Sequence, residues 1–475
     1  MDSSSHPTAS ASRRRHGRRH HKKRRRRHAR LPKTPVYHGR FGPEQAERLL
    51  WRAGFGPREG EAKKLAKKGL KRAVHSLTHP PRDRLNGPAP HDSDGHPLAP
   101  ADAWGHDHLW WLDRMVRSNR PLVERMTLVW HDWFATSNDG VGSQRLMLLQ
   151  NQLFRKHAMG SFASLLLAVT RDPAMLIWLS GVDNTKNAPN ENYGRELMEL
   201  FTLGAGRGYG ENDVREQARA LTGFRNDWDD NIGPHNFRFD PEYHDNGVKK
   251  ILGKRGRFDW RDSARLCLTH RMHPSFFITK LWSYFIPTPP GPHTQRALVR
   301  VYLGTNYAVR PVLERILVHP DLYKGPRMVK PPAVYNAGLL RGMKRGVDTD
   351  SWTWIGHLMG QQLFHPPNVA GWDDTRWLDS GTWRGRWYAA AEAVKDRRID
   401  TDAAYTPDDP QAAVNKAIAF WGNPTMSAKT RSGLLAFAQR VEAAADKPWE
   451  KKSFPILRQN ALRMLVAASP DLQTC

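Results

Sequence analysis

The chain has 475 residues, of which 39% are hydrophobic and 25% charged, a balance typical of soluble globular proteins. Two cysteines are too few for a disulfide framework, and no run of 18 apolar residues could span a membrane, because Arg171, Asp172 and Pro173 interrupt the best candidate, residues 162–179. The formal net charge of +27 favours binding to polyanions such as nucleic acid, anionic lipid or an acidic polymer.

Much of the charge lies near the N-terminus. Residues 13–30 hold twelve Arg or Lys side chains and four His, with no carboxylate. We predict a disordered tail over residues 1–40, which either binds a polyanion or only keeps the protein soluble. No apolar region follows the three arginines that begin this run, so the sequence favours a cytoplasmic protein over an exported one. The candidate polyanion-binding residues are Arg13, Arg14, Arg15, Arg18, Arg19, Lys22, Lys23, Arg24, Arg25, Arg26 and Arg27.

Helical periodicity dominates the rest of the chain. Helices are predicted over 44–55 and 59–77, and a polar loop rich in Pro and Gly over 79–101. Further helices are expected over 103–118, 121–135, 142–157, 161–169, 189–204 and 211–223. A last series is expected over 262–269, 275–285, 295–303, 311–318, 332–343, 352–359, 385–396, 410–420, 426–444 and 454–467.

The insert 224–260 differs in composition from the helical segments around it. Asp, Asn, Gly, His and Phe dominate it, and the segments 236–239 and 248–252 could pair as a small hairpin. The pattern predicts a mainly α fold, a multi-helix globular body over 41–400 with a small irregular or β-hairpin insert. Helices of residues 401–475 should pack on the same body. A dinucleotide-binding sheet is excluded, because the chain has no βαβ rhythm and no Gly-rich phosphate loop.

The segment 189–204, Pro-Asn-Glu-Asn-Tyr-Gly-Arg-Glu-Leu-Met-Glu-Leu-Phe-Thr-Leu-Gly, carries a polar helical face. Arg195 is four residues from both Glu191 and Glu199, which is typical of an exposed, salt-bridged helix. Paired carboxylates equally suit acid–base catalysis or metal binding. One arc of about 140° holds Glu191, Asn192, Arg195, Glu196 and Glu199. The candidate catalytic residues here are Arg195, Glu196 and Glu199, and the candidate substrate-binding residues are Asn190, Glu191 and Asn192.

Two further groups contain histidine. His131 lies in the run Trp-His-Asp-Trp-Phe at 130–134, where it could be a general base held by a carboxylate or a satisfied core histidine. His244 and Asp245 lie in the insert beside an Asn-Gly pair, and either a functional loop or an ordinary turn explains them. A divalent metal could bind side chains of these groups, although none of them has the HxxxH or ExxH spacing typical of metal ligands. The candidate ligands are His131, Glu196, Glu199, His244 and Asp245.

Tryptophans are concentrated between residues 372 and 387. Aromatic faces with polar edges suit sugar rings or the bases of a single strand, and the alternative is that buried Trp side chains fix the C-terminal helices. No Gly-x-Ser-x-Gly nucleophile motif is present. The candidate substrate-binding aromatic residues are Trp130, Trp372 and Trp377, and Trp383 and Trp387 belong to the same run.

Several segments resemble, in the same order, a large bacterial family of uncharacterised proteins called domain of unknown function 1800. They are 47–57, 124–136, 172–176, 189–204, 218–223, 244–245 and 366–372. The resemblance covers about residues 42–390 and implies no established activity. It implies export for many relatives, and a partner resembling the alkaline-phosphatase and sulfatase superfamily, although this chain has no recognisable signal peptide. Phe201 stands where many relatives have a histidine, so no histidine-based role carries over to that position.

Two hypotheses about function follow. In the first, the chain is a hydrolase-like enzyme with a Trp-lined cleft, rich in Glu, His and Asp, for a polymeric, glycan-type substrate. The catalytic candidates His131, Arg195, Glu196, Glu199, His244 and Asp245 should then converge within about 10 Å. In the second, a non-catalytic or scaffold protein binds a polyanion through its basic tail and body.

Overall fold

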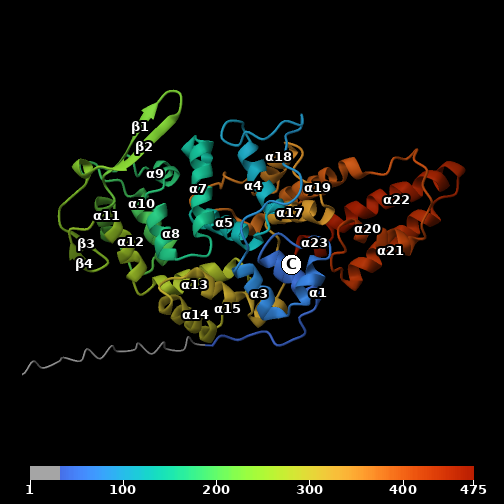
Figure 1. Cartoon of the computed structure of the whole chain (residues 1–475), viewed down its shortest axis with the longest axis horizontal. Helices are drawn as coiled ribbons and strands as arrows, with labels where there is room; N and C mark the ends of the chain where they lie inside the picture. The colour runs from blue at the N-terminus through green and yellow to red at the C-terminus, as the bar shows by residue number, and fades with distance from the viewer. Residues whose placement is uncertain (1–32) are drawn as a thin grey trace, which may run out of the picture. The chain divides into compact units, whose positions relative to one another are not determined.

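The computed structural model describes residues 33–475, and the candidate polyanion-binding arginines and lysines of the tail lie outside this range. The mainly α fold is confirmed: the described residues form α-helices α1 to α23 and two small antiparallel sheets (Figure 1). They belong to one compact unit. Within residues 33–475, every helix is too short or too polar to cross a membrane.

The helices before the insert are mostly short. They are α1 (Pro43–Arg52), α2 (Glu61–Ala66), α3 (Leu70–Thr78), α4 (His106–Arg117), α5 (Pro121–Trp133), α6 (Asn138–Val141), α7 (Gln144–His157), α8 (Phe162–Val169), α9 (Pro173–Trp178), α10 (Asn192–Glu196) and α11 (Glu211–Ala220). A π-helix, η1 (Leu197–Leu203), continues α10.

The helices after the insert extend to the last residues. They are α12 (Trp260–Thr269), α13 (His273–Ser283), α14 (Pro292–Gly304), α15 (Val309–Leu317), α16 (Pro320–Lys324), α17 (Pro332–Met343), α18 (Ser351–Leu358), α19 (Ser380–Val394), α20 (Pro410–Phe420), α21 (Ala428–Ala443), α22 (Pro448–Ala468) and α23 (Pro470–Gln473). Three 3-10 turns accompany the helices: η2 (Pro241–Tyr243), η3 (Asp374–Arg376) and η4 (Lys395–Arg397).

The single helix predicted over 59–77 is wrong, because α2 and α3 occupy this segment as separate helices. Gly69 lies between them with φ 72°, a left-handed conformation that glycine adopts without steric cost. The apolar run 162–179 is likewise divided into α8 and α9. Asp172 caps α9 by accepting a hydrogen bond from the Met175 backbone N at 3.0 Å, which accounts for the predicted interruption.

The insert contains two hairpins instead of the one predicted. Strand β1 (Phe224–Asp229) pairs with β2 (Gly233–Phe239), and β3 (Lys249–Ile251) pairs with β4 (Lys254–Gly256), both antiparallel. The predicted pairing of 236–239 with 248–252 is therefore wrong. Short turns let each segment pair with its nearest neighbour in sequence, which costs less chain entropy than a longer loop. The β1–β2 hairpin projects beyond the neighbouring helices in Figure 1.

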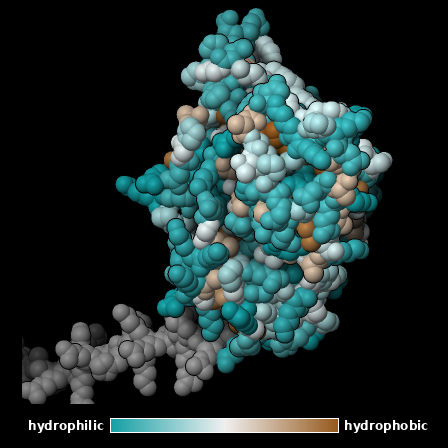
Figure 2. Space-filling model, turned by 90° about the vertical axis from the view of Figure 1, so that its right-hand side faces the viewer, coloured by the Kyte–Doolittle hydropathy of each residue, from teal (hydrophilic) through white to brown (hydrophobic). Residues whose placement is uncertain are grey.

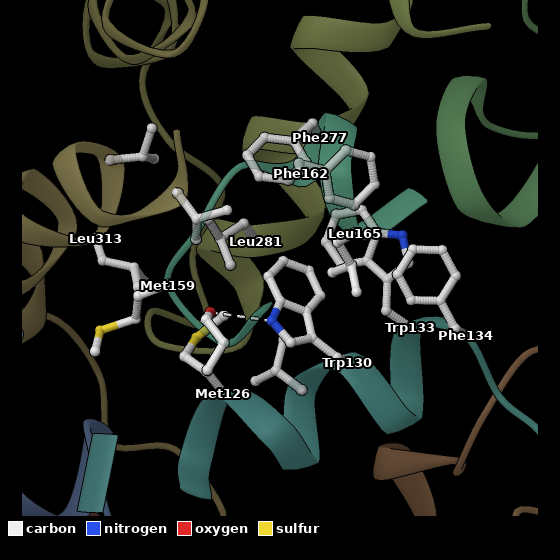
Figure 3. Close-up of a cluster of buried hydrophobic side chains, with 14 of the residues drawn as sticks. Met126, Trp130, Trp133, Phe134, Met159, Phe162, Leu165, Phe277, Leu281 and Leu313 are labelled. Carbon is white, nitrogen blue, oxygen red and sulfur yellow. Dashed lines mark hydrogen bonds between the residues drawn. The ribbon is translucent and has the colours of Figure 1, made fainter. Parts of the chain in front are cut away.

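Helix α5 lies where two hydrophobic clusters meet. Trp130 and Trp133 belong to the first cluster with Phe162 and Phe277, and Leu128 belongs to the second with residues of α4, α17 and α19. Figure 3 shows the first cluster, in which Trp130 and Trp133 project from α5 among Met, Leu and Phe side chains. The Trp130 Nε1 donates to the Ala158 carbonyl at 3.0 Å. Helix α5 is thus fixed on both sides, which makes its C-terminal end a rigid platform.

The C-terminal helices pack mainly on one another. Helices α20, α21 and α22 contact each other, and α22 also contacts α19 and α23. The face of the molecule over this end is mostly hydrophilic, with small scattered apolar areas (Figure 2).

Candidate functional site

Segments that are distant in sequence meet at the C-terminal end of α5. The Asp132 carboxylate accepts two hydrogen bonds, to Oδ1 from the Trp372 backbone N at 2.9 Å and to Oδ2 from the Tyr284 Oη at 2.6 Å. The neighbouring Trp133 donates its Nε1 to the Phe201 carbonyl of η1 at 3.1 Å. Three of the predicted motif segments therefore join here: 124–136, 189–204 and 366–372.

The approach of the third segment to Asp132 depends on glycine. Gly371 has φ +97°, and a Cβ at this position would collide with the Asp132 carboxylate. A side chain here would be strained both by its backbone conformation and by this contact. Residue 371 thus lets the backbone reach Asp132 closely enough for the Trp372 N–H to bind it.

Lys280 of α13 links the end of η1 to the C-terminal end of α5. Its Nζ donates to the Leu200 carbonyl at 3.1 Å and lies 4.8 Å from the centre of the Trp133 ring. The last carbonyls of a helix have no partner within the helix, and a cation at this end is favourable. Burial lowers the pKa of Lys280 to about 8, and Asp132 opposes this shift.

We call Asp132, Lys280, Tyr284 and Asp374 the Asp132 cluster. Burial raises the pKa of Asp132, the hydrogen bond from Tyr284 opposes this shift, and the charge of Asp374 adds to it. Burial and then Asp132 raise the pKa of Tyr284 well above its usual value. Asp374 is exposed, and its pKa is raised by partial desolvation and by Asp373. Carboxyl groups with raised pKa values beside a lysine with a lowered one are the kind of groups that take part in proton transfer.

The predicted acidic helix is divided between α10 and η1. Arg195 Nη2 lies 3.0 Å from the Glu191 carboxylate and 2.8 Å from the Glu211 carboxylate of α11, and the Arg195 side chain is 35% exposed. We call these three residues the Arg195 network, and it corresponds to the salt-bridged alternative. The predicted Arg195–Glu199 pair is absent from the described ion pairs, because Glu199 accepts instead from the Tyr209 Oη at 3.2 Å.

The π-helix explains why the predicted arc fails beyond Glu196. In η1 the turns are wider than in an α-helix, and the Thr202 Oγ1 reaches back five residues to the Leu197 carbonyl at 2.5 Å. Burial raises the pKa of Glu196, and the like charge of Glu199 raises it further. Before the helix, the Asn192 backbone N donates to the Asn190 side chain at 2.9 Å, so the two asparagines form a turn.

His131 is a core residue. It is fully buried, and its ring lies between Trp111, Phe154, Phe364 and Trp372, with centroids 5.3 to 6.1 Å away. Neither ring nitrogen has a hydrogen-bond partner within residues 33–475. Burial lowers its pKa to about 3, so the ring is neutral near pH 7. The structure thus favours a core histidine, although one that is not satisfied by hydrogen bonds.

The pair His244 and Asp245 holds the insert against the end of α11. The His244 Nδ1 lies 2.9 Å from the Thr222 carbonyl, and Arg219 Nε lies 2.7 Å from the Asp245 carboxylate. The buried Lys249 donates to the Asp245 carbonyl. The motif segments 218–223 and 244–245 therefore bind each other.

The tryptophans divide into buried and exposed ones. Trp130, Trp372 and Trp377 are buried and pack in the hydrophobic clusters. Trp383 and Trp387, four residues apart on α19, are 37% and 43% exposed. They lie on the same helix as the exposed Tyr388, whose ring packs edge-on against Trp354 of α18 at 5.8 Å. An aromatic face is thus present, but it uses different tryptophans from those expected to bind substrate.

Within residues 33–475, no hydrogen bond or ion pair joins the side chains of the candidates to one another, namely His131, Glu196, Glu199, His244 and Asp245. The same range contains one set of three metal-ligating side chains within mutual reach, and it is none of these: His75, His79 and Glu314. The two histidines have an HxxxH spacing in the sequence, at 75–79, which the predicted set of metal ligands did not include.

Comparison with known proteins identifies a family but no characterised relative. The family model described as "Protein of unknown function (DUF1800)" matches residues 48–474. Neither the curated proteins nor the solved structures contain a match.

Proposed function

The chain belongs to the DUF1800 family of proteins of unknown function, and we propose that it is a hydrolase that works by acid–base catalysis at the Asp132 cluster. The observation that carries the proposal is the meeting of three motif segments at Asp132, with Lys280 and Tyr284 beside it. Functional sites concentrate groups whose pKa values are shifted by burial and by neighbouring charges.

The exposed Asp374 is the group that would touch the substrate. A hydrolase needs an acid that protonates the leaving group, and the raised pKa of Asp374 favours the protonated carboxyl that this role requires. The adjacent Asp373, which is also exposed, supplies a second carboxylate to activate water. Asp132 and Tyr284 are positioning residues, because they hold the backbone that carries both carboxylates.

A polymeric, glycan-type substrate is supported by the aromatic face of α19, the helix that follows the turn containing Asp374. Turn η3 contains Asp374 and leads directly into α19, and the Thr382 Oγ1 donates to the Arg376 carbonyl at 2.7 Å, which fixes the turn against the helix. Trp383 lies in the first turns of α19 and Trp387 one turn later. Flat aromatic faces beside carboxylates suit a chain of sugar rings.

The test is hydrolysis of a panel of soluble polysaccharides, followed through newly formed reducing ends. Asp374→Asn should lower kcat by at least about 100-fold, the usual contribution of a general acid, without changing the melting temperature. Glu199→Gln is the matched control, because Glu199 is a carboxylate of the predicted acidic helix and lies outside the Asp132 cluster.

Two results would contradict the proposal. If Glu199→Gln or Glu196→Gln abolishes activity and Asp374→Asn does not, catalysis belongs to the acidic helix. If the chain hydrolyses no member of the panel and binds polyanions with a steep salt dependence instead, the scaffold hypothesis is favoured.

A further inference from the structure

The packed edge between α3 and α15 carries metal-ligating side chains outside the Asp132 cluster. His75 lies on α3 and His79 directly after it, and Glu314 lies on α15. One ligand atom from each of the three lies within 4.8 Å of the others. We call these residues the α3–α15 triad.

The two histidines are placed by helical geometry. Side chains four residues apart on a helix lie on the same face, and the rings of His75 and His79 stack with centroids 4.0 Å apart. The His79 Nδ1 lies 3.6 Å from the Glu314 carboxylate. Zn–N and Zn–O bonds of about 2.0–2.2 Å place ligand atoms roughly 3.5 Å apart, so small rotations of the partly exposed side chains would close the set around one ion.

The backbone beneath the triad is rigid. Val74 and Leu77 of α3 and Leu313 and Ile316 of α15 are buried in the same hydrophobic cluster. The buried Thr78 donates its Oγ1 to the Glu314 carboxylate at 3.1 Å, which fixes the orientation of this side chain. A hydrogen bond to a metal-ligating carboxylate is a common supporting feature of metal sites.

We propose that the α3–α15 triad binds one divalent transition metal ion, of which Zn²⁺ is the best match. Two neutral imidazoles and one carboxylate suit Zn²⁺ better than Mg²⁺ or Ca²⁺, which prefer oxygen ligands alone. Three protein ligands leave the fourth position of a tetrahedral ion for water or a ligand. The proposal is independent of the function proposed for the Asp132 cluster.

A hollow beside the triad indicates what could occupy the open position. His79 belongs both to the triad and to the lining of a hollow of about 450 Å³, which Lys64, Lys68 and Glu61 also line. Two ammonium groups against one carboxylate, next to a divalent cation, suit an anionic group. Inorganic phosphate is the simplest probe of this property.

The experiment measures Zn²⁺ binding to the full chain by calorimetry after removal of metal with a chelator. The tail contains histidines of its own, so the informative quantity is the difference between variants and parent. His75→Asn and Glu314→Gln should each abolish the binding of one equivalent of Zn²⁺ or lower its affinity by more than about 100-fold. His96→Gln, which changes an exposed histidine with an Asp neighbour elsewhere, should leave this equivalent unchanged.

Co²⁺ gives a second, spectroscopic readout. The parent should show the intense visible absorption of a four-coordinate Co²⁺ site, shifted by inorganic phosphate, and His79→Ala should abolish it. Because the triad is largely exposed, the metal-free variants should melt at the temperature of the metal-free parent. Unchanged Zn²⁺ stoichiometry and affinity in both His75→Asn and Glu314→Gln would overturn the proposal, as would a Co²⁺ spectrum that His79→Ala does not alter.

Discussion

The Asp132 cluster and the Arg195 network both contain charged residues from predicted motif segments, but they differ in burial. Asp132 accepts hydrogen bonds from two distant segments, and burial shifts the pKa values of Asp132 and Lys280. Arg195 forms surface ion pairs with residues nearer in sequence, Glu191 and Glu211, and its side chain is about one-third exposed. Exposed pairs contribute little because water and salt screen them, whereas buried polar groups are costly to leave unpaired. Burial, which spacing does not reveal, thus separates a functional candidate from a surface feature.

The largest loss of stability is expected for Asp132→Ala. This change leaves the partly buried Tyr284 hydroxyl and Trp372 backbone N–H without their acceptor, and each unsatisfied buried group costs about 1–3 kcal/mol. We expect the free energy of unfolding to fall by about 3–5 kcal/mol in urea denaturation. Tyr284→Phe, which removes one of the two donors, should cost less. A loss below about 1 kcal/mol for Asp132→Ala would erase the contrast with the Arg195 network.

Lys280→Met should cost about 1–2 kcal/mol at pH 7, because the Leu200 carbonyl loses its donor while the cost of burying a charge is removed. Its pKa is lowered to about 8 in the folded protein from about 10.5 when unfolded, so between these values the unfolded chain binds more protons. The parent should therefore gain stability from this group as pH rises from about 8 to 10.5. Urea denaturation at pH 7 and pH 9.5 should show this gain in the parent and a smaller one in the variant.

His131→Phe should change stability at pH 7 by less than about 1 kcal/mol, because the ring lies among aromatic side chains and neither nitrogen has a hydrogen-bond partner among residues 33–475. The folded ring has a pKa near 3 and the unfolded one near 6.5, so the parent loses stability as pH falls through this window. The variant should lose less stability on acidification, measured by thermal melts between pH 7 and pH 4. An unchanged acid dependence would show that His131 is more accessible than its burial indicates.

The smallest effect is expected for Arg195→Gln. Surface ion pairs contribute about 0–1 kcal/mol, and salt weakens them further. Urea denaturation should show a loss within this range at low ionic strength and almost none in 1 M salt. A loss as large as that of Asp132→Ala would place the Arg195 network among the main supports of the fold.

Periodicity predicted most of the helices, since the apolar positions of a helix repeat along its own sequence. The predicted ranges 332–343 and 410–420 coincide with α17 and α20. The strand pairing of the insert could not be predicted in the same way, because it depends on which turns close first. The π-helical geometry of η1 could not be predicted from periodicity either, because side chains from α5 and α13 stabilise it.

The site was harder to predict than the fold because its members come from distant segments. His131 and Asp132 are neighbours, but one faces an aromatic cluster and the other a set of donors. The HxxxH spacing of His75 and His79 can be seen in the sequence. The carboxylate of Glu314 cannot be assigned to them from the sequence, since 236 residues separate it from Thr78, the neighbour of His79. Only the packing of α3 on α15 brings them together.

Side chains of other helices hold the carbonyls at the end of η1, which limits how this helix can unfold. The carbonyls of Leu200, Phe201 and Thr202 are bound by side chains from other helices, namely Lys280, Trp133 and His273, at 3.0 to 3.1 Å. The π-helix therefore cannot unwind unless α5 and α13 release it. Its amide hydrogens should exchange with solvent only in large-scale opening events, whereas the turn around Arg195 can fray on its own. The partly exposed turn around Arg195 and the largely buried η1 are thus joined in one continuous helix.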